Sequence, residues 1–273
     1  MHKQVSHTQK IRIARQFSRA AGQYNEAAQI QLQVAMDALS YLPEQVGVSL
    51  DIGCGTGRIT RMLAARSNTT YAIDIAMGML HYAKTESVSP PDPDGVITWL
   101  QADAEQLPLQ QHSVHTVFSS MVLQWCAQPD LVMQQIRGVL KPGGQAVLAI
   151  MVDNSFFELN SVWAHFDQFR HVNQFHRAET WRQAALNSGL KVEMQRQRYT
   201  SYHLGLRELL SSIKQVGANV LLQASEPNTQ SAQLLSRSLL RQLEAEYRHQ
   251  YATFNALPLS YDLVFLHCQH SDS

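Results

Sequence analysis

A glycine-rich segment between a short apolar run and a polar stretch is the first place where this sequence suggests ligand chemistry. It reads Leu50-Asp51-Ile52-Gly53-Cys54-Gly55-Thr56-Gly57. Gly53 suits a tight turn with positive φ, and Gly55 lets a ligand approach the backbone because it has no Cβ. Gly57 lets the following helix pack close to the strand. The start of that helix offers free N–H groups, which suit a carboxylate or a phosphate.

Two acids narrow the class of ligand. The spacing here is G-x-G-x-G, whereas dinucleotide dehydrogenases use G-x-G-x-x-G. Asp51 precedes the loop, and Asp74 ends the second predicted strand, where its carboxylate can accept hydrogen bonds from both ribose hydroxyls. The pattern favours a nucleoside ligand. A glycine turn without a ligand and an NAD-dependent oxidoreductase remain the alternatives.

Polar residues end two further predicted strands at the same edge. Asp103 follows the third strand and can accept a hydrogen bond from an adenine amino group, or else serve as a helix N-cap. Ser119 and Ser120 end the fourth strand. Open parallel sheets bind ligands at the carboxyl ends of their strands, so these side chains are placed to contact the same ligand.

The elements that must position these residues alternate between strands and helices. Strands are predicted at 47–51, 70–74, 96–101, 114–119 and 145–152, with helices at 56–66, 76–84 and 129–140 and a turn at 141–144. This alternation predicts parallel strands joined by right-handed crossovers. Two helices are expected between Lys10 and Leu42, with a break near Tyr24 after Ala21-Gly22.

The rhythm changes after Asp153. We expect helices at 156–169 and 178–187, a strand at 190–199, a long helical region at 205–251 and a last strand at 261–268. The sequence therefore predicts four parts. They are an N-terminal helical cap (1–45), a ligand-binding core (46–200), a helical lid insertion (201–257) and the final strand of the core sheet (258–273).

Composition excludes several classes of protein. Among 273 residues, Lys plus Arg and Asp plus Glu number 22 each, so the basic surplus typical of nucleic-acid binders is absent. The N-terminus is polar and no apolar run is long enough to span a membrane. The three cysteines are widely spaced and odd in number, which indicates reduced thiols. We expect a cytoplasmic protein that binds neither nucleic acid nor membrane.

The segment Asp51–Gly57 together with Asp74, Asp103 and Lys141–Gly144 resembles the class I methyltransferase pattern over residues 46–152. The resemblance implies a Rossmann-like α/β sheet with an antiparallel last strand, N-terminal helices and a lid. It also implies S-adenosylmethionine as the cofactor. The cofactor-binding residues that it implies are Asp51, Gly53, Gly55, Gly57, Asp74, Ile75, Met79, Asp103, Ala104 and Ser119.

Flanking segments resemble one family more closely, the malonyl-acyl carrier protein O-methyltransferases of biotin biosynthesis. The segments that carry this likeness are Phe17–Tyr24, Val122–Cys126, Ser155–Leu159, Ile213–Ala218 and Pro258–Tyr261. The resemblance implies methylation of the free carboxylate of a malonyl thioester on an acyl carrier protein, or on coenzyme A. The methyl ester removes a charge and primes pimeloyl synthesis for biotin.

Such a carboxylate is ionised at pH 7 and needs no strong general base. Catalysis would rest on alignment of the reacting atoms and exclusion of water. Tyr24 is the preferred donor near the methyl group, while Gln124 and Trp125 should face the same cleft. Lys214, and with weaker support Arg19, are candidates to hold the malonyl carboxylate or the phosphopantetheine arm. Core aromatics and solvated cations are the alternatives.

Two further patterns have ordinary alternatives. Residues 165–200 carry six Lys or Arg against three Asp or Glu, a surplus that suits an acidic carrier protein but also an ordinary solvated surface. His165, His171 and His176 lack the i, i+4 spacing of a helical metal site, so no metal is predicted.

Other functions stay open as alternatives. They are methylation of another small acid or a quinone-like molecule, and cofactor binding without catalysis. A serine hydrolase of the α/β type is disfavoured because the sequence has no G-x-S-x-G elbow.

Overall fold

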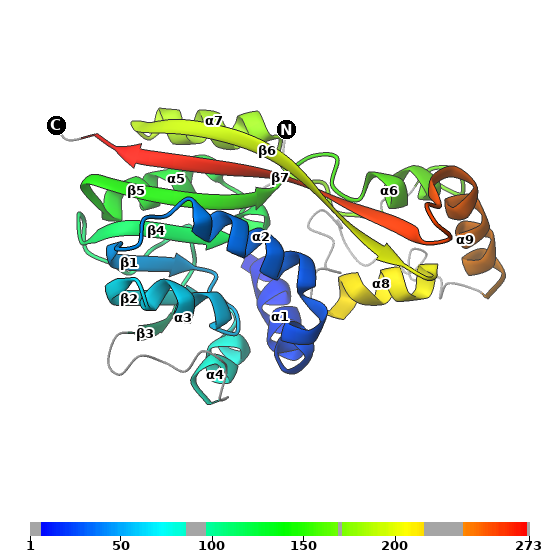
Figure 1. The fold of residues 1–273 in the computed structure, drawn as a ribbon, viewed down its shortest axis with the longest axis horizontal. Helices are drawn as coiled ribbons and strands as arrows, with labels where there is room; N and C mark the ends of the chain where they lie inside the picture. The colour runs from blue at the N-terminus through cyan, green and yellow to red at the C-terminus, as the bar shows by residue number, and fades with distance from the viewer. Residues whose placement is uncertain (1–6, 86–96, 169–170, 216–236, 272–273) are drawn as a thin grey trace.

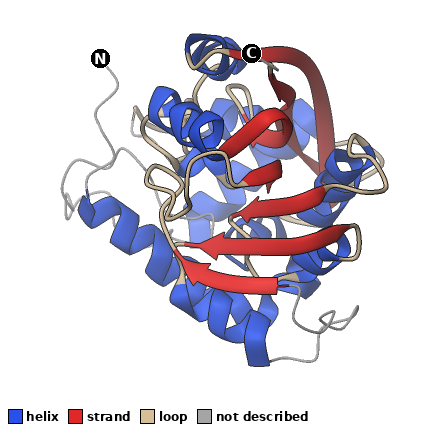
Figure 2. Ribbon diagram, turned by 90° about the vertical axis from the view of Figure 1, so that its left-hand side faces the viewer, coloured by secondary structure: helices blue, strands red, loops and turns tan. Residues whose placement is uncertain are grey.

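The computed structural model describes residues 7–85, 97–168, 171–215 and 237–271. A seven-stranded sheet crosses the molecule, and helices cover both of its faces (Figures 1 and 2). The strands are β1 (Gly47–Ile52), β2 (Ser67–Asp74), β3 (Ile97–Gln101), β4 (Val114–Ser120), β5 (Leu140–Met151), β6 (Leu190–His203) and β7 (Leu257–His270).

The strand order is β3-β2-β1-β4-β5-β7-β6. Neighbours from β3 to β5 pair in parallel, and β7 runs antiparallel to both β5 and β6. The order reverses at β1 and β4, and ligands bind open α/β sheets at such a switch point. The predicted Rossmann-like sheet with an antiparallel last strand is confirmed.

Ten helical segments lie in the described part of the chain. They are α1 (His7–Ala27), α2 (Gln29–Ser40), α3 (Arg58–Ala64), α4 (Met77–Thr85), the 3₁₀ turn η1 (Leu123–Trp125), α5 (Pro129–Val139), α6 (Phe157–Trp163), α7 (Ala178–Asn187), α8 (Leu206–Gln215) and α9 (Arg237–Tyr251). No helix among these described residues is long and apolar enough to cross a membrane.

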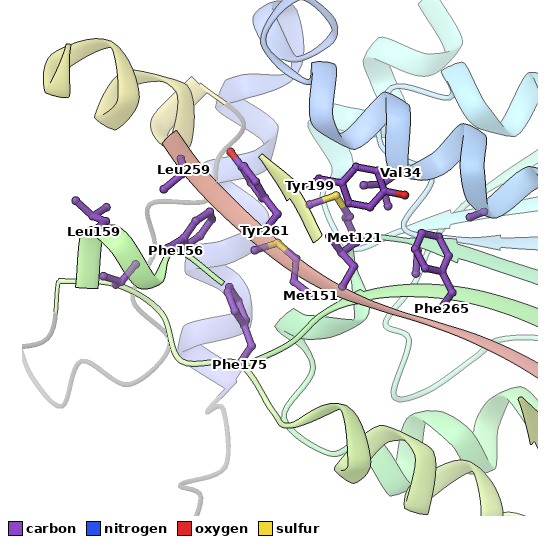
Figure 3. Packing of buried hydrophobic residues seen from close by; sticks show 14 of the residues in the cluster. Val34, Met121, Met151, Phe156, Leu159, Phe175, Tyr199, Leu259, Tyr261 and Phe265 are labelled. Carbon is purple, nitrogen blue, oxygen red and sulfur yellow. The ribbon is translucent and has the colours of Figure 1, made fainter. Parts of the chain in front are cut away.

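Two apolar clusters hold the layers together. One joins the sheet to α5 and α7 through residues such as Met133 and the fully buried Trp181. The other joins the opposite face to α2, α3, α6, α8 and α9. Figure 3 shows the outer part of this second cluster, where Phe156, Leu159 and Tyr261 gather beside the end of the sheet. Helices packed on both faces therefore hold the sheet, and with it the carboxyl ends of the strands, in place.

The break between the first two helices lies at Ala28, not near Tyr24 as the sequence predicts. Gly22 stays helical inside α1, because a single glycine weakens a helix by only about 1 kcal/mol among good helix formers. Ala28 has φ −92° and ψ 44°, outside the helical region, yet its N–H still bonds to Tyr24 O at 2.9 Å. Tyr24 is consequently held in the last turn of α1.

The turn predicted at residues 141–144 is part of β5. Leu140 already pairs with Val114, and the register shifts before Thr116 pairs with Gln145. Gly143 has φ 76°, so the extra residues are accommodated as an irregularity within the strand.

The late strands are longer than predicted, and α8 and α9 lie between them in the chain. β6 and β7 pair from Leu190 with His270 to His203 with Leu257, and their far ends extend past the rest of the sheet to α8 and α9 (Figure 1). Residues 216–218 of the Ile213–Ala218 motif lie outside the described residues. The predicted domain boundaries stay a prediction.

Candidate active site

The loop after β1 is held in one shape by its glycines. Gly53, Gly55 and Gly57 all have positive φ, at 76°, 53° and 79°. The N–H groups of Gly53 and Cys54 both donate to Ile73 O, at 2.8 and 2.9 Å. A Cβ on Gly53 would lie 2.2 Å from the Val122 side chain. Only glycine fits this position, because both the space and the φ exclude a side chain.

The other two glycines have different roles. A Cβ on Gly55 would meet no atom within 4 Å, so the backbone there faces open space in the first of the cavities described below. A Cβ on Gly57 would lie 2.5 Å from Trp99 and 2.6 Å from the Arg61 guanidinium. Gly57 therefore permits close packing, as predicted, but its neighbours are side chains of β3 and α3, and it lines neither cavity at this edge.

Asp74 ties the loops after β1 and β2 together. Its Oδ2 accepts the N–H of Gly55 at 2.9 Å, and its Oδ1 accepts the N–H of Ala76 at 2.7 Å. Burial raises the pKa of Asp74, and these backbone donors oppose that rise. The Ile75 N–H is a third backbone donor to this carboxylate, which has about four acceptor sites, so acceptor capacity remains for a ligand. The carboxylate is thus fixed in position while it remains an acceptor.

Asp51 is a second buried acid beside the loop. It is 3% exposed, and its Oδ2 accepts the Thr60 hydroxyl at 2.6 Å. Burial raises the pKa of Asp51 to about 7, the Thr60 hydrogen bond lowers it, and the charge of Asp74 adds to the rise. Two carboxylates that resist ionisation side by side are favourably placed to attract a cationic ligand.

Two cavities meet at this edge, and Gly53 and Val122 line both. The first, which we call the inner cavity, has about 590 Å³ of empty space, part of it open to solvent. Its lining includes Tyr24, Gln31, Asp51, Gly55, Arg58 and Ser120. The second, the outer cavity, has about 480 Å³ of such space, and its lining includes Lys10, Asp74, Ile75, Asp103, Ala104 and Trp125. The structure brings most of the predicted site residues together here.

Tyr24 reaches the inner cavity from the end of α1. Its ring packs with Ala21, Ala76 and Met79 in the contact between α1 and α4. Burial and the charge of Asp74 raise the pKa of Tyr24 above its ordinary value, so its hydroxyl is a neutral donor at physiological pH. Met79 is 1% exposed and belongs to this packing, and it lines neither cavity.

Lys10 covers the outer cavity from the first turns of α1. Its ammonium bonds to Asp103 Oδ2 at 2.5 Å and also to Glu105. Glu105 in turn accepts the N–H groups of Ala127 and Gln128, at 2.8 and 2.9 Å. Asp103 Oδ1 accepts the N–H of Glu105 at 3.0 Å. This local bond is of the kind that an N-cap residue makes, the alternative to a contact with adenine. Lys10 and Glu105 are site-edge residues that the sequence analysis missed.

The end of β4 contributes a different serine from the predicted one. Ser119 is fully buried, its hydroxyl donates to Ile52 O at 2.8 Å, and it lines neither cavity. Ser120 lines the inner cavity, and its buried Oγ has no hydrogen-bond partner within the described residues. Gln124, expected to face the same cleft as Trp125, is buried and lines neither cavity. It donates from Nε2 to Met121 O at 2.7 Å, while its Oε1 has no partner in the described residues.

Trp125 forms a wall of the outer cavity. It packs edge-on against Phe17 from α1, with ring centres 5.7 Å apart, and against Phe175, at 6.1 Å. Lys214 and Arg19 are exposed and line neither cavity. Arg58 and Gln31 do line the inner cavity. Arg58 could have been found from its place directly after Gly57, whereas Gln31 carries no sequence signal.

The remaining candidates lie away from this edge. His171 stacks on Trp163, with ring centres 3.6 Å apart, and bonds to Asp167. No group of three or more His, Cys, Asp or Glu able to hold a metal occurs in the described ranges. Among the cations of residues 165–200, Arg198 pairs with Asp262 at 2.7 Å and Arg182 with Glu179 at 2.8 Å. Arg170 lies outside the described residues.

Comparison with known proteins first defines a class. Residues 50–148 match the model of a family described as a methyltransferase domain. A phosphoethanolamine N-methyltransferase of Haemonchus contortus, solved with S-adenosyl-L-methionine, has the same fold with a TM-score of 0.55 at 17% identity. The match covers 91% of this chain and 56% of that one. The fold and the site are those of a Rossmann-like methyltransferase.

Two relatives define the family within that class. The malonyl-[acyl-carrier protein] O-methyltransferase of Serratia marcescens is 33% identical over 257 residues, which are 94% of each chain. The biotin biosynthesis bifunctional protein BioHC of Cellvibrio japonicus (strain Ueda107) is 36% identical over 264 residues. That match is 94% of this chain but only 49% of the bifunctional protein. The chain belongs to the malonyl-[acyl-carrier protein] O-methyltransferase family.

Proposed function

We propose that this protein methylates the free carboxylate of a malonyl group carried as a thioester by an acyl carrier protein, and so supplies the methyl ester that primes pimeloyl synthesis for biotin. The observation that carries the proposal is the pair of acids, the buried Asp51 and the half-buried Asp74, around a glycine loop that faces open space at Gly55. The names of the relatives supply the substrate class. Methylation of another small acid or a quinone-like molecule is not favoured by them.

S-adenosylmethionine is the cofactor, and it supplies a methyl group on a positively charged sulfur. The residues at the edge of the sheet fit such a molecule. Asp74 would accept the ribose hydroxyls with its remaining lone pairs, and Asp51 would face the amino-acid part. Ile75, Ala104 and Asp103 would border the adenine in the outer cavity. Two carboxylates beside a cationic ligand explain why acids are kept here despite their burial.

The acceptor needs positioning more than proton transfer. A malonyl carboxylate is already ionised at neutral pH, since carboxyl groups have ordinary pKa values of about 4. Tyr24, whose raised pKa keeps it protonated, and Ser120, whose Oγ has no partner in the described residues, are the donors proposed to orient this carboxylate. Neutral donors hold the oxygen without the strong ground-state pairing that a buried cation would impose.

Exclusion of water is the second task of the chain. α1 lies across the site through the Lys10 contacts with Asp103 and Glu105, and through Phe17 on Trp125. A closed, dry site strengthens the interactions of the charged groups within it. We propose Trp125 as a wall of the reaction space. Gln124 lines neither cavity, and we propose that it supports the turn after β4 from beneath, through its hydrogen bond to Met121 O.

The partner is a carrier protein bearing the malonyl thioester, or coenzyme A in its place. We also propose a cytoplasmic location, which the three free cysteines support because that compartment keeps thiols reduced. This chain spans about half of the length of the bifunctional relatives, and we propose for it only the methyl transfer.

Mass spectrometry of the protein mixed with S-adenosylmethionine and malonyl-acyl carrier protein tests the proposal. The malonyl group should gain one methyl, and Asp74→Ala should abolish the gain. Asp130→Ala, at an exposed acid in the first turn of α5, is the matched control and should retain it. If the cofactor binds by calorimetry but no methyl reaches the malonyl group, the substrate is wrong while the cofactor site stands.

A further inference from the structure

A third cavity lies between the loop after β5 and the segment that leads into α7. It has about 1320 Å³ of empty space, part of it open to solvent. Its lining is mostly polar and includes Asp153, Asn160, Asn173, Gln174, Arg177 and Thr180. None of these residues lines the inner or the outer cavity, so cofactor binding does not account for this third cavity.

The cavity has a built frame. Asp153 N donates to His176 O at 3.2 Å, which joins its two walls. The Ser155 hydroxyl donates to Asp262 O and accepts the Asp262 N–H, both at 3.0 Å, which fixes the loop to β7. Asn154 and Phe156 have φ of 71° and 61°, a conformation that non-glycine residues adopt at an energetic cost. The loop therefore keeps an unusual shape beside the cavity.

A pair of aromatic rings separates this cavity from the outer cavity of the cofactor edge. Phe175 lines the third cavity, and its ring centre lies 6.1 Å from that of Trp125, which lines the outer cavity. Phe156 supports Phe175 from the other side at 6.3 Å, and Figure 3 shows both rings beside the end of the sheet. A ligand in the third cavity is one ring pair away from the space around the cofactor.

The polar groups of the lining suit a particular kind of chain. Carboxamides both donate and accept hydrogen bonds, so the Asn and Gln side chains match the amides of an extended ligand. Asp153 Oδ1 is buried and has no hydrogen-bond partner in the described residues, so it can accept a ligand N–H or O–H. A ligand amide that is desolvated and left unpaired weakens binding, so a cavity that takes up such amides needs polar partners for them.

One end of the cavity favours an anion. Arg177 is exposed at its border and is the N-cap residue of α7, a ten-residue helix, and its own side chain does not cap the helix. A guanidinium and free helix N–H groups together suit a phosphate. The cavity thus offers amide-matching groups along its wall and an anion site at its border.

We propose that this cavity binds the arm of the thioester substrate, a linear chain with two amides that ends in a phosphate. The arm would pass the Trp125–Phe175 pair and then Val122, which lines both the outer and the inner cavity, to reach Tyr24 and Ser120. The inference rests on the proposed function. The same arm occurs in an acyl carrier protein and in coenzyme A, and the cavity recognises the chemistry that they share.

Steady-state kinetics on substrates with and without the arm test the proposal. Thr180→Trp places a large ring in the cavity, and Gln183→Trp places the same ring on an exposed position of α7 outside it. We expect Thr180→Trp to raise KM for malonyl-phosphopantetheine about tenfold, equivalent to ~1.4 kcal/mol, and to leave KM for the S-ethyl malonyl thioester unchanged. Gln183→Trp should change neither value.

A second variant tests the anion site. Arg177→Gln should raise KM for malonyl-phosphopantetheine and for malonyl-acyl carrier protein, but not for malonyl-pantetheine, which lacks the phosphate. Arg182→Gln, which removes a paired surface cation on the same helix, should leave all three unchanged. In the wild-type protein, the ratio of kcat/KM for the carrier-protein and coenzyme A substrates shows which source of the arm the site prefers.

The outcomes separate this inference from the proposed function. If the wild-type protein methylates malonyl thioesters but Thr180→Trp raises KM equally for substrates with and without the arm, or for neither, the arm site is wrong and the reaction stands. If no malonyl thioester is methylated, the proposed function is wrong. Calorimetry with phosphopantetheine alone then still tests the cavity, and no binding would overturn the arm site as well.

Discussion

The two ends of the carboxyl edge of the sheet are built differently. At the cofactor end, Asp51, Asp74 and the glycine loop come from two consecutive strands and are fixed by backbone hydrogen bonds. At the acceptor end, Tyr24, Trp125 and Phe175 come from distant parts of the chain. They are joined only by packing, with Phe17 between Tyr24 and Trp125. The cofactor is therefore recognised by a local motif, whereas acceptor recognition depends on the whole fold.

The two ends also differ in charge. Burial raises the pKa values of Asp51 and Asp74, so the cofactor end holds strained acids that a cation relieves. The acceptor end offers neutral groups, the Tyr24 hydroxyl and the unpartnered oxygens of Ser120 and Gln124 in the described residues. Substitutions should consequently affect cofactor binding at one end and turnover at the other.

The largest effect should follow Asp74→Asn. The amide removes the charge and points a donor at either Gly55 N–H or Ala76 N–H, so both the ribose contact and the loop are weakened. Loss of a charged hydrogen-bond acceptor costs about 1.5–3 kcal/mol, so calorimetry should give about 100-fold weaker cofactor binding. Asp130→Asn is the control. An affinity within threefold of wild type would remove Asp74 from the site.

The next largest effect is expected on stability, where alanine substitutions at two glycines of the same loop should differ. In Gly53→Ala the new Cβ meets the Val122 side chain, so thermal unfolding should show a loss of about 1–3 kcal/mol. In Gly55→Ala the Cβ meets nothing, so stability should fall by less, about 1 kcal/mol or below. The Gly55 methyl nevertheless enters the inner cavity and should weaken cofactor binding. Equal losses of stability would contradict the assignment of separate roles.

Much of the cofactor end could be predicted because its geometry follows from strand ends. Asp51 and Asp74 close consecutive parallel strands, so their meeting is dictated by the sheet. Ser119 shows the limit of this reasoning. Side chains alternate along a strand, so the face of a residue at the strand end depends on the last residue or two. It is Ser120 that lines the inner cavity, while Ser119 bonds to Ile52 within the sheet.

Long-range contacts explain what the sequence left out. Lys10 is 93 residues from Asp103, and no local pattern indicates that they pair. The helix break at Ala28 also depends on tertiary packing, because Gly22 was the stronger local signal. Lys214 was chosen from a family pattern, and the structure places it exposed on α8 away from both cavities of the cofactor edge.

A smaller effect should come from the acceptor end. Tyr24→Phe removes a hydroxyl and keeps the ring that packs against Ala21 and Ala76. If Tyr24 orients the acceptor carboxylate, kcat should fall about tenfold, since one neutral donor contributes roughly 0.5–1.5 kcal/mol. Cofactor affinity by calorimetry should stay within twofold. A wild-type kcat would return Tyr24 to a purely packing role, and a loss confined to cofactor affinity would move it to the other end of the site.

The smallest effect should appear in the pH dependence of cofactor binding. With the pKa of Asp51 at about 7, the carboxylate is ionised above that pH and attracts a cation, and it is largely protonated one unit below. Cofactor affinity should therefore fall a few-fold between pH 8 and pH 6, up to about tenfold if binding requires the ionised form.

In the protein without cofactor, the contribution of Asp51 to folding stability changes with pH in the opposite direction. The raised pKa means that the folded state holds the proton more tightly than the unfolded chain, so this group destabilises the fold above pH 7 and the penalty shrinks as pH falls toward the ordinary carboxyl pKa. The rise in Tm on adding cofactor should consequently be smaller at pH 6 than at pH 8.

Two variants make that prediction specific to Asp51. Thr60→Val removes the hydroxyl that lowers the pKa of Asp51, so the midpoint of the affinity profile should move to higher pH. Asp51→Asn should weaken binding at pH 8 and remove this step from the profile, because the amide does not titrate. A step that persists in Asp51→Asn would belong to Asp74 instead, whose pKa burial also raises. The pair of Asp51 and Asp74 would then still account for the pH dependence of cofactor binding, but Asp74 would be the group that titrates.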